Sequence, residues 1–124
     1  MMNTVLWIVQ SLLAVVFLAS GVVKSIAGKE RLIATGQTGV APYPIGFIRV
    51  IAACEIVGAL GLIVPLATGI APLLTPLAAV GLAIIMIGAA FSHLSLGEWK
   101  QALTVNLILF LLCLFVALGR ILGW

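Results

Sequence analysis

The sequence contains very little charge and no aspartate. Of its 124 residues, 7% are charged and 65% are hydrophobic, and its three acidic residues are all glutamates. A soluble domain usually has roughly 25% charged residues, so this chain lacks the polar surface that would cover such a domain. Without an aspartate, and with His93 as its single histidine, the chain has no Ser–His–Asp triad and no pair of haem-binding histidines. We expect an integral membrane protein that is not a stand-alone enzyme.

Redox-active cysteine pairs and metal-binding motifs are also missing. Cys54 and Cys113 lie in apolar runs, form no C-x-x-C motif and have no His or Cys neighbour at metal-ligand spacing. We interpret them as buried structural thiols, which could still meet because each lies about halfway along its helix. The net charge of +3 does not indicate a nucleic-acid partner, because the basic residues stand singly at the ends of apolar runs.

Long apolar runs make up most of the chain. A helix needs about 20 residues to cross a hydrocarbon core of about 30 Å. Backbone groups at membrane depth must also be paired internally, which favours helices. The sequence predicts spans at residues 4–23, 45–66, 70–92 and 102–122. The predicted fold is an all-α membrane protein, a four-transmembrane-helix antiparallel bundle that forms a single domain over residues 1–124.

The connections hold most of the prolines and charges. The short connection 67–69 predicts a tight hairpin between the second and third spans. Pro72 is expected in the first turn of the third span, where its missing N–H costs nothing, and Pro76 is expected to kink that helix. The segment 41–44 cannot continue a helix, and a short amphipathic piece over 29–35 is expected at the membrane interface.

The basic residues predict the orientation. Because no Lys or Arg precedes Lys24 and the first run has spanning length, we interpret that run as a retained span and not a cleaved signal. Four basic residues fall on the side of the first and third connections, against Arg120 on the other side: Lys24, Lys29, Arg31 and Lys100. The positive-inside rule then places loops 24–44 and 93–101 in the cytoplasm and both termini outside.

Small residues are frequent in the two middle spans. Helices in lipid associate through close approach of their backbones, so such residues indicate packing faces. Gly81 and Gly88 are seven residues apart on one face of the third span. We expect both to pack against other helices of the bundle.

Two ionisable residues lie inside the second span, where burial of charge is expensive. Arg49 lies about one turn in, and Glu55 lies near the midpoint. Six residues of helix separate their side chains by about 9 Å along the axis and about 120° around it, so they are not expected to pair directly. Arg49 could extend to the interface. The Glu55 stem is too short to do so, and Glu55 must therefore be paired, protonated or in contact with water.

Further polar residues are expected in the same half of the membrane. Ser20 and Lys24 share one face of the first span, His93 closes the third span, and Asn106 lies about a turn into the fourth. Three of these residues have a simpler interpretation: Lys24 as an interfacial anchor, His93 as a helix cap and Asn106 as a hydrogen-bonding link between helices. Together they indicate a polar pocket that is closed toward the outside and open toward the cytoplasm.

This pattern resembles the DoxX-like family of small four-helix membrane proteins over nearly the whole chain. The resemblance rests on Ser20-Gly21 with Lys24, on Arg49 followed by the Glu-x-x-Gly-Ala-x-Gly-Leu string at 55–62, on His93 near Gly97-Glu98, and on Asn106-Leu107. It implies a bundle in a bacterial inner membrane. Members look like partners or subunits of membrane oxidoreductases, including thiosulfate:quinone oxidoreductases, whereas related eukaryotic four-helix proteins are linked to receptor assembly or cargo export.

Three functional hypotheses follow. The first is a partner or subunit of a membrane redox complex, with a quinone or a lipid headgroup near Glu55 and Arg49. The second is a small proton-coupled transporter that uses Glu55 as its proton-binding carboxylate. The third is a non-enzymatic chaperone or lipid-binding bundle in which Glu55, Arg49 and Lys24 have a structural role. The lipid bilayer is the expected environment in each case, and a homo-oligomer is compatible with all three. A quinone is a candidate cofactor, and the sequence indicates no particular one.

Overall fold

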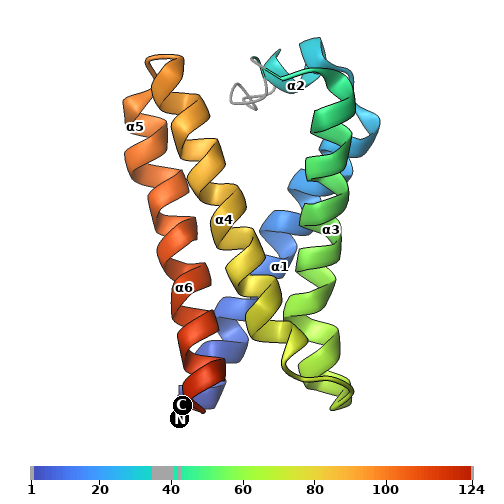
Figure 1. Ribbon diagram of the computed structural model, residues 1–124, viewed down its shortest axis with the longest axis vertical. Coiled ribbons are helices and arrows are strands. Elements are labelled where there is room, and N and C mark those ends of the chain that lie inside the picture. Colours follow the sequence, from blue (N-terminus) through green and yellow to red (C-terminus); the bar gives the residue numbers. More distant parts are fainter. Residues whose placement is uncertain (1, 35–40, 42, 124) are drawn as a thin grey trace.

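Helices make up most of the structure that is described. The computed structural model describes residues 2–34, 41 and 43–123, and no strand occurs among them. The first two spans and the helix between them are α1 (Met2–Ile26), α2 (Lys29–Ala34) and α3 (Ile45–Thr68). The rest of the chain forms α4 (Leu74–Ser95), α5 (Trp99–Gln101), the π-helical turn η2 (Ala102–Asn106) and α6 (Leu107–Leu122) (Figure 1).

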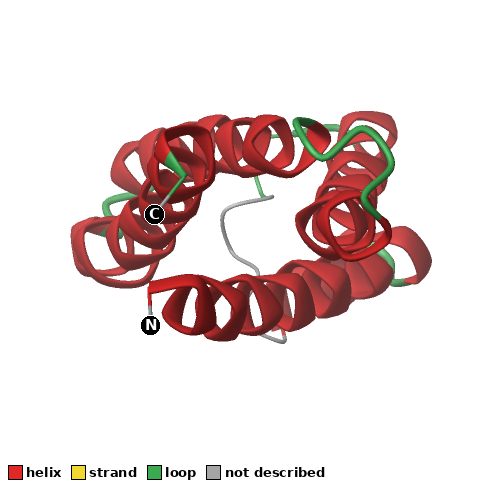
Figure 2. Ribbon diagram, turned by 90° about the horizontal axis from the view of Figure 1, so that it is seen from below, coloured by secondary structure: helices red, strands yellow, loops and turns green. Residues whose placement is uncertain are grey.

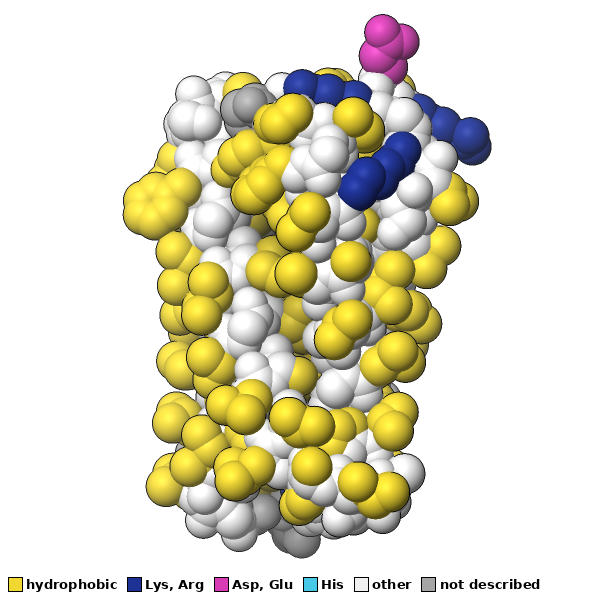
Figure 3. Space-filling view, turned by 45° about the vertical axis from the view of Figure 1, so that its right-hand side comes forward, with side chains coloured by type: hydrophobic (Ala, Val, Ile, Leu, Met, Phe, Trp, Pro, Cys, Tyr) yellow, Lys and Arg dark blue, Asp and Glu magenta, His cyan; other side chains and the backbone are white. Residues whose placement is uncertain are grey.

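Four of these segments are long and apolar enough to cross a membrane, as the sequence predicts. They are Met2–Ile26, Ile45–Thr68, Leu74–Ser95 and Ala102–Leu122. Many of their large apolar side chains are exposed, among them Val57 at 68% and Phe91 at 68%. In Figure 3 hydrophobic side chains cover the flank of the bundle, and the charged side chains on this face gather at the end that carries α2. The chain is a multi-pass membrane protein with its flank in contact with lipid.

The bundle consists of two helix pairs. α1 packs most extensively on α3, α4 packs on α6, and α3 and α4 form the antiparallel hairpin that joins the pairs. Both termini lie at one end, and toward the other end, with α2 and α5, the pair α1–α3 and the pair α4–α6 diverge (Figure 1). Viewed along the bundle, the long helices are arranged around a common centre (Figure 2).

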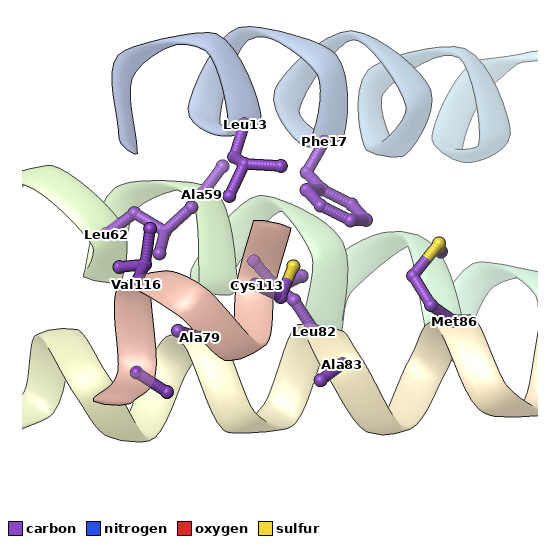
Figure 4. Packing of buried hydrophobic residues seen from close by; sticks show 11 residues of the cluster. Leu13, Phe17, Ala59, Leu62, Ala79, Leu82, Ala83, Met86, Cys113 and Val116 are labelled. Carbon is purple, nitrogen blue, oxygen red and sulfur yellow. The ribbon is translucent and has the colours of Figure 1, made fainter. Parts of the chain in front are cut away.

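The main apolar core fills the middle of the bundle and its terminal half. Leu13 and Phe17 of α1 meet Leu62 of α3, Leu82 of α4 and Cys113 of α6 in this core (Figure 4). These five side chains are 0–1% exposed. They come from all four spans, so burying them fixes the relative position of the helices.

Glycines allow the closest helix contacts within this core. A Cβ on Gly58 would lie 2.8 Å from Leu82 Cδ2, and one on Gly21 would lie 2.9 Å from the Ala52 carbonyl oxygen. Gly81 and Gly88 do not behave as predicted, because a Cβ on either would have nothing within 4 Å. The α4 residues that pack are instead Ala79, Leu82 and neighbours on the opposite side of the helix. Seven-residue spacing shows that two residues share a face, but not which face is buried.

The third span begins later than predicted. Residues 70–73 form the connection, Gly69 caps α3 in the left-handed conformation at φ 72°, and Ala71 has φ 49°. Pro72 therefore precedes α4. Pro76, predicted to kink the helix a turn deeper, lies in the first turn that starts at Leu74, where no backbone donor is required. The turn is as apolar as the helix, so hydropathy does not reveal it.

A smaller core lies under α2. Leu32 is completely buried against Ala27 and Ile48, with Tyr43 packed beside them. The amphipathic piece predicted over 29–35 is thus confirmed as α2 up to Ala34, and its last residue lies outside the described part of the chain. This small core fastens α2 to the ends of α1 and α3.

Candidate functional site

A cavity of about 670 Å³ lies between the helix pairs in the half of the bundle that carries α2 and α5. Its walls come from the last turns of α1 and α4, the first half of α3, and the junction of η2 with α6. Most of the lining is apolar. The polar side chains of the lining are Ser20, Lys24, Tyr43, Glu55, His93 and Asn106. Five of the six residues predicted to form a pocket therefore line one cavity.

The central polar contact of the cavity wall is an ion pair between α1 and α3. Lys24 Nζ lies 2.6 Å from Glu55 Oε1, and the side chains are 12% and 1% exposed. Lys24 is thus directed into the protein and is not an interfacial anchor. Glu55 Oε2 is buried without a hydrogen-bond partner. The carboxylate is stabilised by the ammonium group, but half of its hydrogen-bonding capacity remains free.

Arg49 supports this ion pair without lining the cavity. Its guanidinium Nη1 donates a hydrogen bond to the backbone carbonyl of Lys24, near the C-terminal end of α1, where a positive charge is favourable. No direct contact joins Arg49 to Glu55 among the described side-chain pairs, as expected from their positions on the helix. Arg49 is the one predicted pocket residue outside the cavity lining, and it fixes the backbone from which Lys24 extends.

His93 pairs with Glu98, a residue that the sequence reasoning missed. His93 Nδ1 lies 2.8 Å from Glu98 Oε1, with side chains 9% and 33% exposed. A Schellman motif brings them together: the Glu98 N–H donates to the His93 carbonyl, and the Gly97 N–H donates to the Leu94 carbonyl. Gly97 adopts φ 78°, which a residue with a side chain rarely does. The signal in the sequence was the Gly-Glu pair directly after a helix that ends near a histidine.

Asn106 enters the cavity wall at the end of a π-helical turn. A π-helix is wider than an α-helix and occurs mostly as a single turn, frequently at functional sites. Asn106 is 5% exposed. Its Nδ2 lies 3.7 Å from Met86 Sδ on α4, and its Oδ1 is buried without a partner. The predicted link between helices is present, although it is a weak bond to a thioether.

Ser20 lies one helical turn before Lys24 and is half-buried in the cavity wall. Its hydroxyl can donate or accept a hydrogen bond. Ser20 and Lys24 therefore present two adjacent polar groups from α1 to the same space, as their spacing predicts.

Neither thiol belongs to the cavity lining. Cys113 lies in the main core, as predicted, and both thiols are free. The prediction that Cys54 is buried is wrong: it is exposed on α3, because an apolar run in a membrane helix does not show which of its faces is turned inward. Among the residues that the structure describes, no three His, Cys, Asp or Glu side chains are placed to hold a metal ion. The cavity therefore combines a mostly apolar lining with a few side chains that can form hydrogen bonds or carry charge.

A second polar cluster, which the sequence reasoning also missed, lies at the end with the termini. The buried Gln10 donates through Nε2 to the Leu62 carbonyl at 2.6 Å and accepts from Arg120 Nε at 2.6 Å. Arg120 also donates to Asn3 Oδ1 at 2.7 Å and lies over the Trp7 ring. None of these residues lines the cavity; the cluster joins α1, α3 and α6.

Comparison with known proteins identifies the family. A sequence model of the DoxX-like family matches residues 8–116, a range that includes the second and third spans, most of the first and fourth, and every polar residue of the cavity lining. The chain belongs to the DoxX-like family. No curated protein and no solved structure matches it.

Proposed function

We propose that this DoxX-like protein binds a small amphiphilic molecule, a quinone or a lipid headgroup, in its intramembrane cavity and acts as a partner or subunit of a membrane redox complex. The observation that carries the proposal is the Lys24–Glu55 ion pair in the wall of an otherwise apolar cavity. Charged groups inside a membrane are expensive, and they usually mark a pathway or a binding site.

The size and lining of the cavity support a ligand with a polar head and an apolar body. Sites for small molecules typically have volumes of about 300–1,000 Å³, are mostly apolar and contain a few placed polar groups. The cavity volume of about 670 Å³ falls in this range. Phe17 and Phe47 can contact an apolar ring or chain, while Lys24 and Glu55 stand where a polar head would be held.

A dependence on a partner follows from what the cavity residues can do. They can hold a molecule and exchange protons with it, but the two free thiols lie outside the cavity lining. Electrons would therefore come from or go to another subunit, as the family resemblance implies. The family resemblance supports a bacterial inner membrane as the location. The concentration of basic residues in loops 24–44 and 93–101 supports an orientation with these loops in the cytoplasm and both termini outside. A second copy of the chain is an alternative partner.

The test is to identify what the protein carries from its native membrane. We expect extraction and mass spectrometry of the purified protein to yield a quinone or a specific lipid in near-stoichiometric amount. Glu55→Gln should lose it, because the uncharged amide cannot hold Lys24 in place. The matched control is Gln10→Glu, which changes a buried polar residue of the same helix bundle outside the cavity. If no molecule co-purifies and Glu55→Gln leaves partner activity unchanged, the proposal is wrong.

A proton-coupled transporter is the alternative that one observation favours, namely the unpartnered Oε2 of Glu55. An exporter of this kind would release protons when substrate binds, and Glu55→Gln would abolish the release. Absence of Glu55-dependent proton release would exclude this alternative. A purely structural bundle would instead lose thermal stability in the Glu55 and Arg49 variants without losing any bound molecule.

A further inference from the structure

The unsatisfied polar atoms of the cavity wall are of one chemical kind. Four buried side-chain nitrogen or oxygen atoms lack a hydrogen-bond partner among the described residues. Two of them belong to residues that line the cavity, Glu55 Oε2 and Asn106 Oδ1. Both are acceptors. A buried acceptor without a donor is costly, so a donor supplied from within the cavity would relieve that cost at both positions.

His93 adds a third acceptor in its neutral form. A carboxylate can only accept hydrogen bonds, so the contact with Glu98 Oε1 at 2.8 Å places a proton on His93 Nδ1. In the neutral imidazole, Nε2 then carries a lone pair. Glu98 contacts this ring, and Lys24 and Glu55 line the same cavity. The Lys24 ammonium is bound to Glu55, and among the described residues both buried lining atoms that lack a partner are acceptors.

These acceptors come from both helix pairs. Glu55 lies on α3, whereas His93 lies on α4 and Asn106 at the start of the fourth span. The two pairs diverge at this end of the bundle (Figure 1), and the cavity separates them. A molecule that donates to both sides would connect the two helix pairs.

We infer that the ligand of the cavity carries at least two O–H or N–H donors on an apolar body, and that a molecule offering only carbonyl oxygens binds less well. The inference rests on the proposed function and specifies its ligand. A diol is the simplest such molecule, and it can come from two sources: an aromatic diol, such as the reduced form of a quinone, or the glycerol head of a lipid. Glu98 is a positioning residue, because it fixes the imidazole tautomer through Nδ1.

The test compares probes on the unaltered protein, so it does not depend on any variant folding. The protein is placed in phosphatidylcholine nanodiscs, because sugar-based detergents would compete with their own hydroxyl groups. Binding is measured by calorimetry for octylhydroquinone, its dimethyl ether and octylbenzoquinone, and for 1-O-octylglycerol and its dimethyl ether. We expect at least one diol to bind 10-fold or more tightly than its own dimethyl ether, and the preferred diol identifies the source.

Variants locate the effect. Asn106→Leu and Glu98→Leu should each reduce the ratio between diol and ether affinities about 3-fold or more, whereas the control Thr104→Val should leave it unchanged, because Thr104 is exposed on the same π-helical turn. A merely structural role for Glu98 would not alter that ratio. Equal affinities for diols and ethers, or tighter binding of the benzoquinone, would overturn the inference and leave the proposed function standing. No binding by any probe would refute the proposed function itself.

Discussion

The two halves of the bundle differ in what surrounds their buried polar groups. At the end with the termini, Gln10 is fully buried and uses both ends of its amide, toward the Leu62 carbonyl and Arg120. At the other end, Glu55 and Asn106 each keep a buried oxygen without a donor beside a cavity of about 670 Å³. Thr75 Oγ1 and Arg120 Nη2 also lack a partner, but neither residue lines the cavity. Only the unsatisfied oxygens of Glu55 and Asn106 belong to residues beside empty volume, which is why we propose a ligand as their partner.

Removing one partner of the ion pair should give the largest effect. Lys24→Met leaves the Glu55 carboxylate buried without a counter-charge, so we expect a loss of about 3–5 kcal/mol in the free energy of unfolding. Denaturation by SDS in mixed micelles measures it. The double variant Lys24→Met/Glu55→Met should recover most of the loss, since two apolar side chains of similar length replace the pair. A single variant as stable as the wild type would contradict the assigned contact.

Breaking the cluster at the terminal end should cost less and leave the cavity unaffected. Gln10→Leu removes two interhelical hydrogen bonds, which average about 0.6 kcal/mol each in membrane proteins, so we expect a loss of roughly 1–2 kcal/mol. Ser11→Ala, at an exposed neighbouring position, is the control. Ligand content should not change. A Gln10→Leu variant that loses its bound molecule would mean that the two halves are not independent.

Alanine at two glycines should distinguish the packed half from the hollow half. In Gly58→Ala the new Cβ would lie 2.8–2.9 Å from Leu82 Cδ2 and Cγ, and such overpacking typically costs about 1–3 kcal/mol. Gly88 lines the cavity and has open space around it. Gly88→Ala should therefore stabilise α4 by up to about 1 kcal/mol. Thermal unfolding of both variants in one detergent measures the difference. Unfolding temperatures that shift in the same direction for both variants would contradict the prediction.

The smallest effect on stability is expected from Asn106→Leu. It removes a weak bond to Met86 Sδ and also removes the unsatisfied Oδ1, so the two consequences oppose each other and the net change should stay below about 1 kcal/mol. Unfolding in SDS micelles, with Thr104→Val as reference, measures it. A loss of 3 kcal/mol or more would show that Asn106 is a structural residue and not a ligand-facing one.

The spans and the location of the polar half could be predicted from the sequence, because both depend on local composition. Apolar runs define the four helices, and the burial cost of Glu55 indicates that it faces inward. The start of α4 could not be predicted, since residues 70–73 are as apolar as a helix and the turn depends on backbone geometry at Gly69 and Ala71.

Contacts between distant residues account for what was missed in the polar clusters. Gln10 and Arg120 are 110 residues apart in the sequence, and neither is unusual by itself: a glutamine near a helix start and an arginine near a helix end. The contact of Glu98 could not be predicted for a different reason. Glu98 lies in a short polar loop, and only the backbone geometry of the Schellman motif brings it close to His93. The Lys24 side chain is long enough to extend either to the membrane interface or into the bundle. Its inward direction is set by the position of Glu55, which the sequence does not give.

The central claim is that the hollow half holds a ligand and the packed half does not. The most direct measurement is photo-crosslinking with a diazirine-bearing alkylhydroquinone in nanodiscs, followed by peptide mapping of the adducts. We predict adducts on cavity-lining residues of several helices, such as Ile51, Ile85 and Leu109, and competition by unlabelled octylhydroquinone. Adducts restricted to lipid-facing residues such as Val57 and Leu60, without competition, would contradict the account.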